Sequence, residues 1–101
     1  MSKISLIAKL PCQEGKNDEM EAALATLVEA ANDEAGLEIY SAHKADENTY
    51  WFFELYTDAA ALEVHGKGDA MKAAMGAVGG CLAGAPEITR MTPVVAKGMD
   101  I

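Results

Sequence analysis

The chain has 101 residues, half of them apolar and about a quarter charged, the size and composition of one globular domain over residues 1–101. Its formal net charge is −8, from 16 acidic and 8 basic residues. Such a surface repels phosphate groups and no Lys/Arg stripe offsets it, so nucleic acids and anionic membranes are poor partner candidates.

The number of cysteines and the first ten residues indicate in which cellular compartment the protein is expected. Cys12 and Cys81 lack CxxC or metal-site spacing, and a disulfide-built secreted domain would carry more cysteines. The first ten residues lack a signal-peptide core and cleavage site, and no apolar stretch is long enough to span a bilayer. We therefore expect a cytoplasmic protein with reduced thiols, in which Cys81 is a small buried hydrophobe.

The first third of the chain predicts a strand followed by a helix. Residues 4–10 are β-rich and partly alternating. A turn over 11–15 leads into a helical pattern with Asn17 as candidate N-cap, and Gly36 is expected to end it in the left-handed C′ position. The apolar stripe of this helix, at spacings of three and four, consists of Met20, Leu24, Leu27, Val28 and Ala31.

Two strand-like runs come next, at residues 37–44 and 49–56. The short polar connection between them predicts an antiparallel hairpin. Along the second run Trp51, Phe53 and Leu55 alternate with other large side chains, so both faces of this strand are apolar.

The remaining residues predict a helix in two pieces and a last strand. Asp58 is expected to cap the first piece, which runs to about His65, and Asp69 to cap the second after a glycine-containing interruption. Residues 87–95 predict the final strand, with Pro93 near its end.

The order β-α-β-β-α-β is that of a ferredoxin-like α+β fold, a four-stranded antiparallel sheet with both helices on one face. The helices cover only one apolar face of the strand at 49–56, and no further segment remains for the other. A second copy of the chain is the economical cover, so we expect a homodimer.

The strand at 49–56 and the helix after it carry a distinctive run, WFFELYTDAAAL over residues 51–62, followed by His65. It resembles the hallmark of the antibiotic-biosynthesis-monooxygenase family: an aromatic-rich strand, Glu, an aromatic residue, Asp, small and apolar residues, then His. Gly15-Lys16, Gly36 and residues 83–86 also match, and the resemblance covers nearly the whole chain.

The resemblance implies a dimeric α/β barrel with a pocket between each protomer's sheet and helices. Activities in the family include cofactor-free oxygenation of quinols or anthrone-like polyketides, haem degradation, and isomerisation of a phosphorylated dione. The Asn, Trp and His of the haem-degrading branch fall on Ala8, Tyr56 and Met75 here, which disfavours haem degradation. Many members have a second His a few residues later, and the matching position here is Ala70. This chain therefore departs from any mechanism that needs two histidines in this segment.

Cofactor-free oxygenation needs a base, a water-poor pocket for the resulting anion, and access for O₂. His65 is the candidate base because histidine titrates near neutrality, and its position three residues after Leu62 directs it toward the sheet. Glu54 is the candidate partner that orients the imidazole or stabilises its charged form. Two well-separated histidines without a close carboxylate pair predict no metal site.

The predicted substrate-binding residues are Tyr40, Phe52, Tyr56, Met71 and Met75. Phe52 and Tyr56 share the strand face of Glu54, and the Tyr40 hydroxyl is a candidate donor to a substrate oxygen. Structural roles compete with these: His65 bonding a backbone carbonyl, Glu54 pairing with a lysine or capping the next helix, and the tyrosines and methionines packing in the core. We expect His43 to be solvated.

Three functions remain open. The preferred one is a cofactor-free monooxygenase, an oxidoreductase acting on a quinol-like or polyphenolic compound with O₂. The second is an isomerase of a small carbonyl compound, which needs cations for a phosphate from Lys9, Lys44 or Lys72. The third is a non-catalytic ligand-binding dimer.

Overall fold

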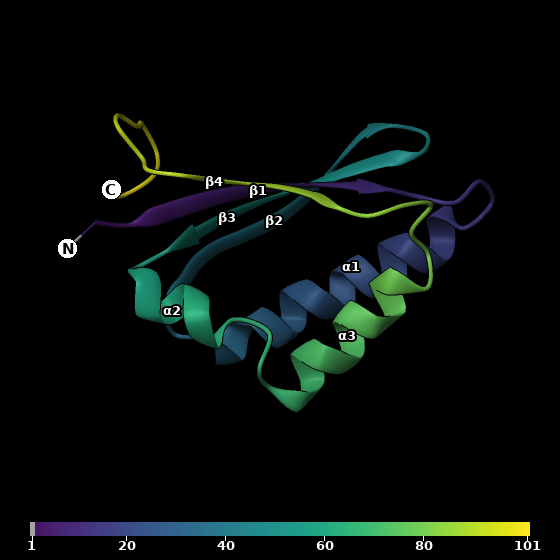
Figure 1. Cartoon of the computed structure of the whole chain (residues 1–101), viewed down its shortest axis with the longest axis horizontal. Helices are drawn as coiled ribbons and strands as arrows, with labels where there is room; N and C mark the ends of the chain where they lie inside the picture. The colour runs from purple at the N-terminus through teal and green to yellow at the C-terminus, as the bar shows by residue number, and fades with distance from the viewer. Residues whose placement is uncertain (1) are drawn as a thin grey trace.

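The fold is a four-stranded antiparallel sheet with all of its helices on one face, as a computed structural model describing residues 2–101 shows (Figure 1). The strands are ordered β2-β3-β1-β4. The expected β-α-β-β-α-β order is confirmed, with the second helix split into α2 and α3. In chain order the elements are β1 (Ile4–Pro11), α1 (Asn17–Ala30), the short 3-10 helix η1 (Ala31–Asp33), β2 (Leu37–Asp46), β3 (Thr49–Tyr56), α2 (Ala59–Val64), α3 (Asp69–Gly79) and β4 (Glu87–Met91).

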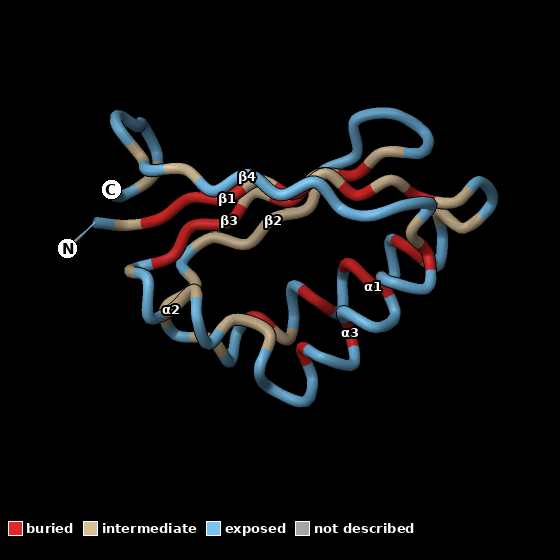
Figure 2. The backbone as a smooth tube through the Cα atoms, viewed as in Figure 1, coloured by how far each residue is buried: buried red, intermediate tan, exposed pale blue. Residues whose placement is uncertain are grey.

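The core lies between the sheet and the long helices α1 and α3, which run side by side beneath it (Figure 1). Figure 2 shows buried positions along β1 and β3 and on the sheet-facing sides of the helices. The β1–β3 register places Leu6 opposite Glu54 and Ala8 opposite Phe52, on the face that the helices cover. The helices contribute Met20, Ala23, Leu24, Leu27, Met71, Ala74 and Val78. Each large apolar side chain buried here contributes roughly 1.5–3 kcal/mol to folding.

The face of the sheet away from the helices is also apolar. Ile7 pairs with Phe53 across β1 and β3, and Trp51 lies two residues before Phe53 on the same face. These three side chains are half-buried, and within residues 2–101 no helix covers them (Figure 1). No helix of the described chain combines the length and apolar character needed to cross a membrane.

The helix caps differ in part from expectation. Lys16, not Asn17, occupies the N-cap position of α1, and no side chain caps that end. The Asn17 amide instead donates to the Glu47 carbonyl and lies 3.2 Å from the Tyr50 hydroxyl, so it ties the helix to the β2–β3 hairpin. The N-cap prediction for Asp58 is confirmed, since its Oδ1 accepts a hydrogen bond from Ala61 N at 2.9 Å.

Two other cap and strand predictions are wrong. Gly68, not Asp69, holds the N-cap position of α3. The last strand ends at Met91 and not at residue 95, because Met91 pairs with Ser5 and β1 begins at Ile4, so the chain beyond has no strand to pair with. Pro93 also prevents β4 from continuing, since it has no N–H to donate to a neighbouring strand.

The left-handed prediction for Gly36 is also wrong. The helix ends earlier, at Ala30, and η1 follows, while Gly36 has no positive φ. Glycine is needed here for space: a Cβ at this position would lie 2.4 Å from Ala61 Cβ. Helix α2 therefore approaches the start of β2 closely, which sets the position of His65, the residue that follows α2.

Gly36→Ala is expected to destabilise the protein by about 1–3 kcal/mol, because the new methyl group forces α2 away from β2. Denaturant unfolding followed by circular dichroism measures this change. Gly76→Ala is the matched control: it lies in α3 with open space around it, and we expect a gain of roughly 0.5–1 kcal/mol from its helix propensity. Equal effects of the two substitutions would contradict the close approach.

Candidate active site

A cavity of about 390 Å³ lies between the inner face of the sheet and the helices. Most of its lining is apolar, and one end is polar. The apolar part is formed by Leu6, Ala8, Leu10, Leu27, Phe52, Leu62, Met75, Val78, Gly79, Leu82, Pro86 and Ile88, and the polar end by Tyr40, Glu54, Tyr56 and His65. An apolar cavity with a few convergent polar groups is the usual form of a small-molecule site.

His65 reaches this polar end from the C-terminus of α2. Its backbone N–H bonds to Leu62 O at 3.2 Å, and Gly66 follows with a φ of +81°, a conformation that glycine adopts without strain. The chain thus turns away directly after the histidine while its side chain, only 13% exposed, points toward the sheet. The predicted inward orientation of His65 is confirmed.

The imidazole lies between two carboxylates. Its Nδ1 is 2.8 Å from Glu34 Oε1, a hydrogen-bond distance, and its Nε2 is 3.8 Å from Glu54 Oε1. The second distance is too long for a hydrogen bond. The rings of Tyr40 and Tyr56 stand edge-on to the imidazole at 5.4 and 5.5 Å between centroids.

Glu54 is a buried carboxyl group whose Oε1 accepts a hydrogen bond from the Tyr56 hydroxyl. Burial raises the pKa of Glu54, and the bond from Tyr56 and the proximity of His65 oppose part of that rise. Glu54 neither pairs with a lysine nor caps α2, which Asp58 caps. Those structural alternatives for Glu54 are therefore wrong.

The two tyrosines remain hydrogen-bond donors at neutral pH. Burial, then the bond to Glu54 and its charge, raise the pKa of Tyr56 well above its ordinary value of 10.0. Burial and the charges of Glu54 and Glu34 also raise the pKa of Tyr40. Tyr40 pairs with Glu54 across β2 and β3, and its ring stacks on Phe52 at 4.4 Å between centroids.

The structure brings together six of the seven residues that the sequence singled out. Tyr40, Phe52, Glu54, Tyr56, His65 and Met75 all line the cavity. Met71 does not: it is buried in the core, with 2% exposure. The sequence reasoning missed Glu34, which lies between η1 and β2 and meets His65 across 31 positions of sequence. No local spacing or motif marks such a contact.

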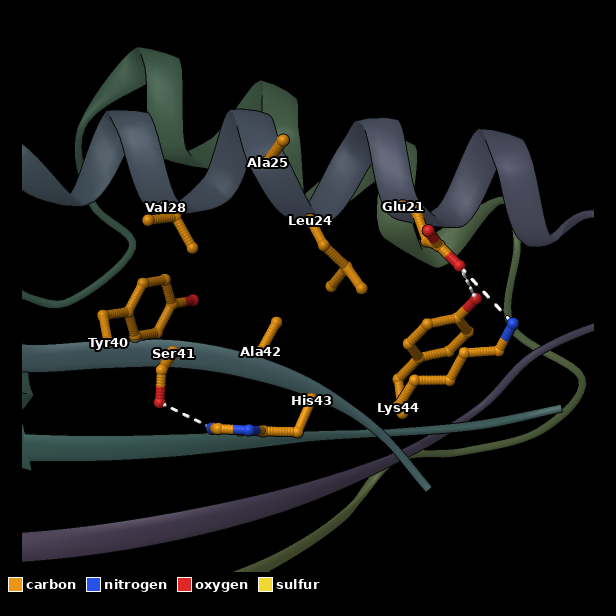
Figure 3. A pocket seen from close by; sticks show the side chains of 10 residues that line it. Glu21, Leu24, Ala25, Val28, Tyr40, Ser41, Ala42, His43 and Lys44 are labelled. Atoms are coloured by element: carbon orange, nitrogen blue, oxygen red, sulfur yellow. Dashed lines mark hydrogen bonds and ion pairs between the residues drawn. The ribbon is translucent and has the colours of Figure 1, made fainter. Parts of the chain in front are cut away.

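A second groove, of about 570 Å³, runs between α1 and β2 (Figure 3). Tyr40 and Val28 face each other there, Glu21 accepts a hydrogen bond from Tyr50 at 2.6 Å, and Lys44 lies 3.7 Å from Glu21. His65 and Glu54 lie outside this groove. The smaller cavity is the better candidate site because the buried titratable cluster lines it.

The charges around the cavity restrict what it accepts. Glu54 and His65 are the charged or basic residues in its described lining, and no Lys or Arg joins them. Lys9 lies over Trp51 on the opposite face of the sheet, and Lys72 is exposed on α3. Nor do residues 2–101 hold a cluster of three His, Cys, Asp or Glu side chains suited to a metal ion.

The raised pKa of Glu54 predicts a specific pH dependence of stability. A carboxyl group whose pKa is higher in the folded state favours folding when protonated. Its contribution is therefore full below the unfolded pKa and is lost as pH rises through the folded pKa. Over that pH window the free energy of unfolding of the wild type should fall relative to that of Glu54→Gln. The fall should be about 1.36 kcal/mol for each unit by which the pKa of Glu54 in the folded state exceeds its pKa in the unfolded state. Denaturant titrations at several pH values measure this, and parallel curves would contradict the assignment.

The sheet order and the helices on one face define a ferredoxin-like α+β protein, with a largely apolar cavity between the sheet and the helices. The sequence profile of the antibiotic biosynthesis monooxygenase family matches residues 3–77. The chain belongs to this family, as its sequence resemblance indicated.

Solved structures with the same fold support that assignment. A Caulobacter crescentus protein, provisionally described as an antibiotic biosynthesis monooxygenase, is 33% identical, with a TM-score of 0.86 over 93% of this chain and 92% of its own. A Nitrosomonas europaea protein of unknown function is 26% identical, with a TM-score of 0.84 over 99% and 97% of the two chains. No curated protein matches the chain.

Proposed function

We propose that this protein is a cofactor-independent monooxygenase, an oxidoreductase that oxygenates a small quinol-like or polyphenolic substrate with O₂. The observation that carries the proposal is His65, held between Glu34 and Glu54 at the one polar end of an apolar cavity. The family to which the chain belongs is named for monooxygenase activity.

The first step is removal of a phenolic proton by His65. A general base near neutrality needs an unprotonated nitrogen within reach of the substrate hydroxyl, and Nε2 lies toward Glu54 in the lining of the cavity. The imidazolium that forms is stabilised by the two carboxylates. The Tyr40 hydroxyl is the donor for a substrate oxygen, because the Tyr56 hydroxyl already donates its proton to Glu54, and this hydrogen bond stabilises the phenolate in a water-poor site.

The phenolate then supplies the electrons for O₂. One electron passes to O₂, and the resulting superoxide and phenoxyl radical combine to form a C–O bond at a ring carbon. Cleavage of the O–O bond leaves a carbonyl on the ring and releases water, which takes up the proton held by His65 and the hydrogen of that carbon. A benzenediol and O₂ thus give a hydroxyquinone and water. The aromatic and apolar walls suit a flat neutral ring.

The charges favour this reaction over isomerisation of a phosphorylated carbonyl compound. A phosphate requires cationic or strong N–H partners, whereas the cavity lining contains a carboxyl group and no Lys or Arg. An anionic substrate would meet repulsion from Glu54.

His65→Ala is expected to lower the rate of O₂ consumption with a suitable quinol by about 10²–10⁴-fold, the usual contribution of a positioned base. Oxygen-electrode measurements across a panel of quinols and polyphenols provide the test. His43→Ala is the matched control, because His43 is exposed on β2, and it should retain wild-type turnover.

Two results would count against the proposal. Unchanged turnover in His65→Ala would remove its role as base. Substrate conversion that continues under anaerobic conditions would point to an isomerase, and no conversion of any quinol or dione by the wild type would favour a ligand-binding role.

We also propose that the protein is a homodimer whose two sheets pack through their helix-free faces. Trp51, Phe53 and Ile7 give that face its apolar character, and Val94 and Val95, in the segment after β4, are 83% and 86% exposed. Contiguous exposed apolar surface usually marks an interface. The two free, buried cysteines are compatible with a reducing compartment such as the cytoplasm.

Trp51→Glu is expected to convert the dimer into a monomer, because a carboxylate cannot be buried unpaired at an apolar interface. Light scattering coupled to size exclusion measures the molar mass, which should equal two chains for the wild type and one for the variant. Val64→Glu, at an exposed position of α2, should remain dimeric. A wild type with the mass of one chain would refute the dimer.

A further inference from the structure

We infer that Glu34 is a positioning residue that holds the proton of neutral His65 on Nδ1 and thereby makes Nε2 the nitrogen that acts on the substrate. The inference rests on the proposed function for its effect on the rate, and its structural part can be tested without substrate.

The geometry of the Glu34 carboxylate supports this role. Its Oε1 lies 2.8 Å from His65 Nδ1, and its Oε2 accepts a hydrogen bond from Gly66 N at 3.3 Å. The Glu34 and His65 side chains are each 13% exposed, so water competes little for the contact. The two carboxylate oxygens thus contact the two residues that follow α2, His65 and Gly66.

The chemistry of the pair then fixes the tautomer. An ionised carboxylate only accepts hydrogen bonds, so a contact of 2.8 Å places a proton on Nδ1. Neutral imidazole carries one ring proton, and Nε2 is therefore left with its lone pair. The hydrogen bond at one ring nitrogen commonly sets the protonation of the other in this way.

The free nitrogen lies where the proposed reaction needs it. Nε2 is 3.8 Å from Glu54 Oε1, beyond hydrogen-bond distance, and His65 and Glu54 both line the cavity. The rings of Tyr40 and Tyr56 flank the imidazole edge-on and restrict its rotation. Glu34 itself does not line the cavity, so it acts through His65 and not on the substrate.

Glu34 also fixes the place of the base relative to the sheet. It lies three residues before the start of β2, with Leu37 N bonded to Glu34 O at 3.0 Å, and its side chain reaches 32 residues along the chain to Gly66. The same short segment includes Gly36, which permits the close approach of α2. Glu34 would make the same contacts if it only stabilised the fold, so the test must measure which ring nitrogen of His65 carries the proton.

Glu34→Gln is the informative variant because it keeps the size of the side chain and removes the charge that holds the proton on Nδ1. Long-range ¹H–¹⁵N NMR at a pH where histidine is neutral distinguishes the two tautomers by their ring ¹⁵N shifts. We expect the wild type to show the Nδ1–H form and Glu34→Gln to lose that preference. Glu63→Gln, an exposed position of α2, is the matched control and should keep the wild-type spectrum.

The kinetic expectation is a loss in kcat with little change in KM. The loss should be at least roughly tenfold and no greater than the 10²–10⁴-fold contributed by the base itself. Glu34→Asp restores a carboxylate and should recover the Nδ1–H signal and part of the rate. Glu63→Gln should leave both parameters unchanged.

A wild-type spectrum of the Nε2–H form, or a Glu34→Gln spectrum identical to wild type, would overturn the inference. Failure of the proposed function has a different signature: the tautomer responds to Glu34→Gln as expected, yet no quinol consumes O₂.

Discussion

The structure depends on the alternation of side chains along β3, which makes both faces of one central strand apolar. On the inner face Tyr50, Phe52 and Tyr56 pack toward the helices, while Trp51 and Phe53 lie on the other side. The helix-covered face encloses the cavity, and on the outer face Trp51 and Phe53 remain half-buried, without a helix over them. Glu54 stands on the inner face between aromatic residues, so the same alternation that builds the core also buries a carboxyl group beside His65.

A buried carboxyl group opposes folding when it is ionised, and its presence in this core calls for a reason. The Tyr56 hydroxyl and His65 offset part of the desolvation of Glu54, and in the described chain no buried side-chain nitrogen or oxygen lacks a hydrogen-bond partner. Polar clusters of this kind, with perturbed pKa values inside a cavity, are enriched at functional sites. Glu34 extends the cluster outward from the cavity to the start of β2, and links the chemistry to the packing of α2.

Much of this arrangement could be predicted from the sequence, because it follows from short periods. Period-two alternation places Phe52, Glu54 and Tyr56 on one face, and the helical spacing from Leu62 directs His65 inward. The inward facing of Tyr40 needed the β2–β3 register, which the hairpin sequence does not specify. Glu34 and Gly36 were beyond prediction since their roles come from contacts with His65 and Ala61, far along the chain. Met71 has the spacing of a pocket residue, yet it packs in the core and does not line the cavity, a property of packing that spacing does not encode.

The central feature of the proposed site is a buried imidazole with one free nitrogen facing an apolar cavity. A crystal structure of the protein grown anaerobically with a simple quinol tests this most directly. We expect the quinol ring between the sheet and α3, with a phenolic oxygen roughly 2.6–3.2 Å from His65 Nε2. A quinol bound instead in the groove between α1 and β2, or bound in the cavity with its hydroxyl groups turned away from His65, would contradict it.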